Sequence, residues 1–230
     1  MGKLISIVML LLMTSWSYAN DIYVTQSGAS LDLDITQDGQ NNTVGNSTTS
    51  SASTGASTTL NIDQVGNSNV ITYQINGATY TGVINLVGNS NNVDLNCDST
   101  GNNSSCGTAN AVINFTGNSN DIDLDIGQTS SANTADVDIV GQSGSDSNVV
   151  AATVDGNSAI LTITINGDTN NYLIDIDGNG DVNGHTLIHS HTGGTADVDI
   201  VQSGINDQYI NLTTSGDNHD IDIHQTALYG

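Results

Sequence analysis

Apolar and polar residues alternate in short segments along most of the chain. The alternation is clearest in "DIDLDI" at 121–126, "AILTITI" at 159–165 and "NYLIDI" at 171–176. A period of two places alternate side chains on the same face of a strand. The pattern therefore predicts β-strands with one buried face and one solvated face.

Glycines followed by polar turn residues recur about every 11 residues between these segments. Such a spacing accommodates a strand of five or six residues and a turn. Two spacings form a strand-turn-strand-turn unit of about 22 residues. We therefore predict an all-β fold, a parallel β-solenoid (β-helix) with rungs of about 22 residues. The glycines that set the spacing are Gly28 and Gly39; Gly66, Gly77 and Gly88; Gly156, Gly167 and Gly178; and Gly204 and Gly216.

Asparagine and glutamine recur in phase with the expected buried faces. A buried amide is costly unless hydrogen bonds satisfy it, and identical amides on successive rungs can satisfy one another. We expect a structural amide ladder formed by Gln26, Gln37, Asn42, Gln64, Asn69, Asn91, Asn120, Asn170, Gln202 and Gln225.

Residues 1–19 have the features of a secretory signal peptide. Lys3 precedes the apolar run "LISIVMLLLM", and the small residues Ser17 and Ala19 stand where a signal peptidase cleaves. This run is too short for a comfortable membrane span, and no later segment is long and apolar enough to cross a bilayer. We expect a secreted protein at an extracellular or cell-surface location.

Residues 20–230 are expected to form one solenoid repeat domain with inserted loops. The alternation is lost near 45–59, 98–108 and 129–134, where Ser, Thr, Gly and Asn predominate. Cys97 and Cys106 flank the second of these segments. Because an exported chain meets an oxidising environment, we expect the two cysteines to form a disulfide.

The charge of the chain excludes some classes of function. Its 24 acidic residues face a single basic one, Lys3, so the net charge is −23. Such a surface does not favour nucleic acid. Many aspartates alternate with buried positions and are interpreted as solvated outer faces, whose mutual repulsion salt or cations would reduce. The sequence contains neither a nucleophile elbow nor a phosphate loop, and we predict no enzymatic activity.

One segment has the spacing of a calcium loop. In "DIDGNGDVN" at 175–183, oxygen-bearing side chains stand at Asp175, Asp177, Asn179 and Asp181. Thr186 occupies the twelfth position, where such loops need a bidentate carboxylate. The simpler interpretation is a polar corner of the repeat, with weak calcium binding as the alternative and no other cofactor expected.

Three histidines, His185, His189 and His191, lie close together in the sequence, and the last two would share one strand face. A transition-metal site is one interpretation, and surface or corner histidines are the simpler one. His219 and His224 occupy repeat positions and are expected to replace amides.

The repeat itself is similar to that of the curlins, the subunits of bacterial curli fibres. In both, a Gln is followed by Gly two residues later, by Asn or Asp at five, by alternating apolar residues and often by Gln at eleven. The pattern is clearest in "QSGASLDLDITQDGQNN" (26–42), "QVGNSNVITYQ" (64–74) and "QSGINDQYINLTTSGDNHDIDIHQ" (202–225). At many Gln positions this chain has apolar residues, such as Ile75 and Ile126, and its loops, cysteines and acidity depart from the family pattern.

The resemblance implies a β-solenoid that leaves the cell through a dedicated outer-membrane channel. It also implies polymerisation into amyloid fibres of the biofilm matrix with the help of a nucleator. The predicted function is thus a secreted structural protein that stacks end to end with copies of itself. The repeat pattern in "IYVTQSG" (22–28) and "IDIHQTALYG" (221–230) agrees with this, because neither segment has the Pro or Lys that often guards an edge strand.

A second hypothesis is a monomeric acidic β-solenoid that acts as an adhesin, an ice-binding protein or a calcium-binding module. A flat face would then make the contacts, through Thr162 and Thr164 or through Thr213 and Thr214. Threonine columns that recur on each rung would support this hypothesis.

Overall fold

A computed structural model describes residues 20–39, 41–45, 48, 50–97, 106–127, 134–142, 144–156, 158–177, 184–205 and 208–227. The predicted signal peptide, residues 1–19, lies outside this part of the chain. Every helix or strand assigned within it is a strand. The strands are β1 (Asn20–Ile22), β2 (Thr25–Ser27), β3 (Ser30–Asp38), β4 (Asn42–Val44), β5 (Ser51–Val65), β6 (Val70–Val87), β7 (Asn92–Cys97), β8 (Thr108–Thr116), β9 (Asp121–Ile126), β10 (Thr134–Gly141), β11 (Val149–Val154), β12 (Ser158–Asn166), β13 (Asn170–Ile176), β14 (Thr186–Thr192), β15 (Ala196–Gly204), β16 (Tyr209–Ser215) and β17 (His219–Ala227).

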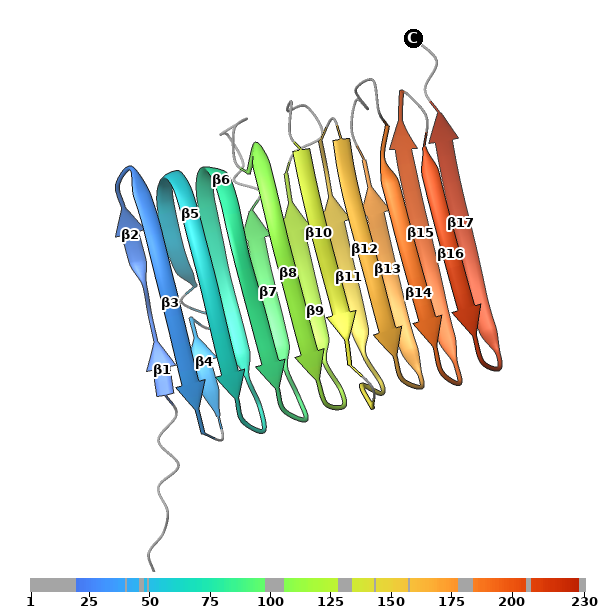
Figure 1. Cartoon of the computed structure of the whole chain (residues 1–230), viewed down its shortest axis with the longest axis horizontal. Coiled ribbons are helices and arrows are strands. Elements are labelled where there is room, and N and C mark those ends of the chain that lie inside the picture. The colour runs from blue at the N-terminus through green and yellow to red at the C-terminus, as the bar shows by residue number, and fades with distance from the viewer. Residues whose placement is uncertain are drawn as a thin grey trace, which may run out of the picture.

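The strands wind into a β-solenoid of about 7 turns, which confirms the predicted fold class. From β7 onward, successive strands belong to opposite faces and run in opposite directions, while neighbours within a face are parallel (Figure 1). The β8 face contains β3, β8, β10, β12, β14 and β16, and the β9 face contains β1, β2, β4, β7, β9, β11, β13, β15 and β17. The long strands β5 and β6 run through a corner and contribute to both faces.

The spacing between rungs confirms the 22-residue unit and locates the insertions. Asn20 and Asn42, in register on neighbouring rungs, are 22 residues apart, as are Asn69 and Asn91. The separation rises to 27 residues between Asn42 and Asn69 and to 29 between Asn91 and Asn120. Extra residues are therefore accommodated outside the strands without a change in the pairing of the rungs.

The prediction of a loop at 45–59 is wrong for most of that segment. Strand β5 begins at Ser51, and its buried positions hold Ser51, Ser53 and Thr58. Ser53 Oγ lies 3.0 Å from Thr58 Oγ1, and the backbone N–H of Val24 donates to Ser51 Oγ at 3.0 Å. Because hydroxyl side chains occupy inward positions that apolar or aromatic residues fill on the next rung, the first part of the strand, 51–59, has no apolar periodicity in its sequence.

The other two predicted loops lie largely outside the described residues. Strand β8 begins at Thr108 and β10 begins at Thr134, so each strand starts where the corresponding loop was expected to end. Cys97, the last residue of β7, and Cys106 form a disulfide with their Cα atoms 5.9 Å apart. Both cysteines are fully buried.

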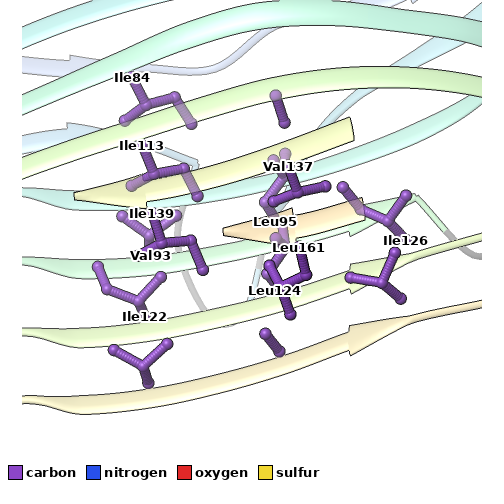
Figure 2. Packing of buried hydrophobic residues seen from close by; sticks show 14 of the residues in the cluster. Ile84, Val93, Leu95, Ile113, Ile122, Leu124, Ile126, Val137, Ile139 and Leu161 are labelled. Carbon is purple, nitrogen blue, oxygen red and sulfur yellow. The ribbon is translucent and has the colours of Figure 1, made fainter. Parts of the chain in front are cut away.

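The hydrophobic core lies between the two faces and extends along the solenoid axis. One column consists of equivalent isoleucines on successive rungs of the β8 face, and all are fully buried: Ile62, Ile84, Ile113, Ile139 and Ile163. Figure 2 shows Ile84, Ile113 and Ile139 in line beside Val93 and Ile122 of the β9 face. Each such side chain contributes roughly 1.5–3 kcal/mol by burial.

Candidate functional site

Asparagine side chains form a continuous ladder inside the β9 face. Each donates from Nδ2 to Oδ1 of the asparagine one rung nearer the C-terminus. The distances are 3.4 Å from Asn20 to Asn42, 3.2 Å from Asn42 to Asn69, 2.7 Å from Asn69 to Asn91, 2.6 Å from Asn91 to Asn120, 2.7 Å from Asn120 to Asn148 and 2.8 Å from Asn148 to Asn170. The ladder reaches His191, whose Nδ1 lies 3.5 Å from Asn170 Nδ2.

Two ladder members, Asn20 and Asn148, were missed by sequence reasoning. The other members follow a glycine by three residues, whereas Asn148 follows Ser145 at that spacing and Asn20 has no such glycine before it. Ser145 takes the place of the corner glycine, because the carbonyl oxygen of Ser145 faces Gly167 as the oxygen of Gly66 faces Gly88. Asn148 has the same parity as the apolar alternation that starts at Val150, and this parity could have predicted its inward position.

The predicted glutamines form two separate pairs and do not join the asparagine ladder. Gln64 Nε2 donates to Gln37 Oε1 at 2.6 Å in the β8 face, and Gln225 Nε2 donates to Gln202 Oε1 at 2.9 Å in the β9 face. Gln26 instead donates to the carbonyl oxygen of Ser30 at 3.2 Å. The ten predicted amides therefore belong to one ladder, two pairs and one side chain at the N-terminal edge.

Asparagines on the outer faces separate many of the aspartates. Asn61 donates to Asp34 at 2.8 Å, and Asn85 donates to Asp63 at 2.6 Å. Such charge-assisted bonds between rungs reduce the repulsion expected of a continuous carboxylate column. Where Asp123 lies in register with Asp94, burial and then the Asp94 charge raise the pKa of Asp123.

The corner after β11 brings several carboxylates together around Asp155. Asp155 Oδ1 is buried and has no hydrogen-bond partner in the part of the chain that the structure describes. Burial, and next the neighbouring Asp177 carboxylate, raise the pKa of Asp155 to about 7, with smaller contributions from Asp175 and Asp125. The carboxyl group of Asp155 is thus partly protonated near neutral pH.

We expect Asp155→Asn to stabilise the protein at pH 7.5 and to leave its stability unchanged near pH 4. An unfolded aspartate titrates near 3.8 and the folded one near 7. Between these values the folded state binds more protons, so stability falls as pH rises through this window. Urea unfolding of both proteins from pH 4 to 8 measures the effect, and parallel stability curves would contradict it.

The calcium-loop candidate is only partly covered by the described residues, because Asn179 and Asp181 lie outside them. Asp175 lies on β13, and burial followed by the Asp177 charge raises its pKa. Asp177 accepts a hydrogen bond from the Ser203 hydroxyl. Within the described ranges, no group of three or more His, Cys, Asp or Glu side chains is arranged to hold a metal ion.

The expectation of surface or corner histidines is wrong for His189 and His191 of β14, whereas His185 lies at the corner directly before that strand. His185, His189 and His191 are fully buried and point into the core. His219 follows Ala196 in the column of the asparagine ladder, whereas His224 pairs with Val201 on the outer side of β17 and replaces no interior amide. The period-two alternation with Leu187 was a signal for the inward position of His189 and His191.

Of the two threonine pairs proposed as flat-face contacts, Thr162 and Thr164 both lie on the outer side of β12, whereas Thr213 and Thr214 lie on opposite sides of β16. Thr164 is in register with Ser190 and Thr213 on the outer side, but Thr214 lies at an inward position. A longer hydroxyl column follows the outer edge of the β8 face: Ser30, Ser57, Thr79, Thr108, Thr134 and Ser158.

These features define a class of protein, the parallel β-solenoids with interior amide ladders. No family model matches the chain, and neither the curated proteins nor the solved structures contain a match. Within the described residues, no helix is long and apolar enough to span a membrane.

Proposed function

We propose that this chain is a secreted structural protein, a curlin-like subunit that assembles end to end into extracellular amyloid fibres. The observation that carries the proposal is that the two end rungs of the described solenoid are open and have matching side chains. The curlin-like repeat and the predicted signal peptide support the extracellular location, and the same resemblance supports export through an outer-membrane channel and growth from a nucleator.

Each end of the solenoid has an edge without a strand partner among the described residues. At the C-terminal end, β16 pairs with β14 and β17 pairs with β15, leaving their other edges open. At the N-terminal end, β1 pairs with β4, while β2 and β3 pair with β5. An open edge offers backbone donors and acceptors to another parallel strand, so it is a template for further stacking.

The side chains at the two ends fall into the same columns. If β17 of one copy is followed by β1 and β2 of the next, Ile221 meets Ile22, Ile223 meets Val24 and Gln225 meets Gln26. On the other face, Ile210 and Leu212 of β16 meet Leu33 and Ile35 of β3. Ile221 and Ile223 are 37% and 48% exposed, so stacking would bury apolar surface that the single copy leaves in water.

The glutamines support stacking of the C-terminal end of one copy on the N-terminal end of the next. Glutamines lie in the first rung and the last two rungs of one column, at Gln26, Gln202 and Gln225, while most interior rungs hold apolar residues such as Ile126. Gln225 already donates to Gln202. A donation from Gln26 of the next copy to Gln225 would continue the same direction of hydrogen bonding across the junction.

We expect purified residues 20–230 to form fibres in moderate salt with a seeded lag phase. Salt is needed because Asp220 of one copy comes near Asp21 of the next, and screening weakens this repulsion. Thioflavin fluorescence, electron microscopy and a diffraction spacing of about 4.7–4.8 Å along the fibre measure assembly. A protein that stays monomeric for days in salt and calcium would refute the proposal.

A matched pair of variants tests the junction itself. Ile223→Lys places a charge in the apolar column of the open end, and we expect it to slow seeded elongation at least tenfold. His224→Lys adds the same charge on the outer side of the same strand and should elongate like the wild type. Equal elongation rates for the two variants would exclude stacking through this end.

A monomeric solenoid with a ligand-binding face is the second candidate. The hydroxyl column of the β8 face favours it, because neighbouring rungs place one hydroxyl about every 4.8 Å in register. This candidate predicts a stable monomer, so the assembly experiment separates the two.

A further inference from the structure

The rung formed by β14 replaces apolar core residues with histidine. His189 is in register with Ile163 of the preceding rung, and His191 is in register with Ile165. Ala159 donates its backbone N–H to His185 Nδ1 at 3.2 Å. These three imidazoles form a cluster, the histidine rung, at positions that earlier rungs fill with Ile or Ala.

The histidine rung has few polar partners. The Tyr172 hydroxyl lies 2.9 Å from His191 Nδ1, and the Tyr172 ring packs edge-on against His189 with centroids 4.4 Å apart. His191 packs edge-on against His219 at 5.3 Å. Both ring nitrogens of His189 and the Nε2 atoms of His185 and His191 are buried without a hydrogen-bond partner among the described residues.

The elements packed against the histidine rung supply little negative charge. Strand β12 presents apolar residues, and β15 presents apolar residues and the neutral amide of Gln202. Strand β16 presents Leu212 and Thr214, β13 presents Tyr172 and Asn170, and β17 presents His219. Asp168 acts on His191 and Asp177 acts on His185, each favouring the protonated ring. The charge acting on His189 comes from His191, which disfavours protonation.

This environment favours neutral imidazoles. Burial, and next the proximity of His191, lower the pKa of His189 to about 4, and burial also lowers the pKa of His185 and His191. Unfolded histidine titrates near 6.5. The unfolded state therefore binds more protons between about 4 and 6.5, so stability is complete above this window and falls as pH decreases through it.

We propose that the histidine rung makes the C-terminal part of the solenoid, β14 to β17, an acid-releasable segment that opens while the preceding rungs stay folded. A solenoid rung contacts only its neighbours, so loss of one rung near an end does not require loss of the others. The four strands beyond β13 include both open edges of the C-terminal end. Release would therefore expose a new edge, formed by β12 and β13. The proposal concerns the single folded chain and does not depend on fibre formation.

Hydrogen–deuterium exchange of the freshly prepared monomer tests the proposal. For one histidine with the two pKa values above, acidification from pH 7.5 to 4.5 lowers the protection factors of the segment on the order of 100-fold. We expect this loss in β14–β17, with β6–β9 unchanged. Unchanged protection of β14–β17 at pH 4.5 would overturn the proposal.

Two variants assign the effect to the histidine rung. His189→Ile copies the residue of the preceding rung and should keep β14–β17 protected at pH 4.5. His224→Gln removes an outer-face histidine of the same segment and should remain as acid-sensitive as the wild type. The reverse pattern would overturn the assignment.

An independent readout covers the case in which His189→Ile does not fold. Imidazole NMR of the wild-type monomer should show His189 neutral at pH 6, with protonation accompanying the loss of protection in β14–β17. Titration of His189 near pH 6.5 in an intact solenoid would contradict the proposal.

Discussion

Gly117→Ala is expected to destabilise the central rungs by more than about 4 kcal/mol, the range of the most disruptive single substitutions. Gly117 has a φ of +125°, which side-chain-bearing residues rarely adopt. A Cβ atom at this position would lie 1.5 Å from the carbonyl oxygen of Gly88 on the preceding rung. The contact is with backbone, so relief requires the two rungs to separate at this corner. Urea unfolding followed by circular dichroism and hydrogen exchange measures the loss.

Gly144→Ala is the matched control for the effect of the backbone angle alone. Gly144 also has a positive φ, +83°, but apart from its chain neighbours no atom of the described residues lies within 4 Å of the position of a Cβ. The variant therefore carries conformational strain without a clash, and we expect a cost of about 1–2 kcal/mol. Similar losses for the two variants would show that close stacking of corners does not explain the glycine repeat.

The recurrence of glycine has its physical reason in this stacking. A Cβ on Gly66 would lie 2.4 Å from the carbonyl oxygen of Gly39, and one on Gly88 would lie 2.1 Å from the oxygen of Gly66. The spacing in the sequence predicted the corners correctly, because turns and strands of regular length place the corner glycines at regular intervals. The close approach between corners is a property of rungs distant in sequence, and no local pattern reveals it.

The same distinction separates the amides that sequence reasoning found from those that it missed. Asn69 and Asn91 follow corner glycines at a constant distance, so their shared column was predictable. Asn148 follows an irregular corner, and its place in the ladder became evident only from its bonds to Asn120 and Asn170. The alignment of neighbouring rungs decides which amides form hydrogen bonds with one another. Insertions change the sequence spacing between aligned residues.

Predictions from residue type are wrong where interior positions are polar. Ser53 and Thr58 lie in the core because each satisfies the hydroxyl of the other, so hydrophobicity alone does not identify the strand. His189 was expected at the surface or at a corner, yet its parity with Leu187 places it inside. In a solenoid, the parity of a residue within its strand decides burial more strongly than the type of its side chain.

Asn120→Ala is expected to lower the free energy of unfolding of the central rungs by about 3–4 kcal/mol. Asn120 Oδ1 accepts hydrogen bonds from Asn91 Nδ2 at 2.6 Å and from the Asn91 backbone N–H at 3.3 Å, while Asn120 Nδ2 donates to Asn148 Oδ1 at 2.7 Å and to the carbonyl oxygen of Gly117 at 2.5 Å. Alanine removes all four bonds and leaves a gap at a buried position of the ladder. Each buried polar group that loses its partner costs about 1–3 kcal/mol, although Asn91 keeps a weaker bond to Gly88 at 3.2 Å.

The appropriate control is an asparagine on the same rungs whose hydrogen bond faces solvent. Asn92 donates to Asp121 at 3.3 Å on the outer side of the β9 face. Because water replaces that bond, Asn92→Ala should cost less than about 1 kcal/mol. Hydrogen exchange should also show that Asn120→Ala opens β7, β9 and β11 first, since each rung depends on its neighbours. Equal losses for the two variants would mean that the interior ladder contributes no more to stability than an exposed amide, and that repetition of asparagine has another cause.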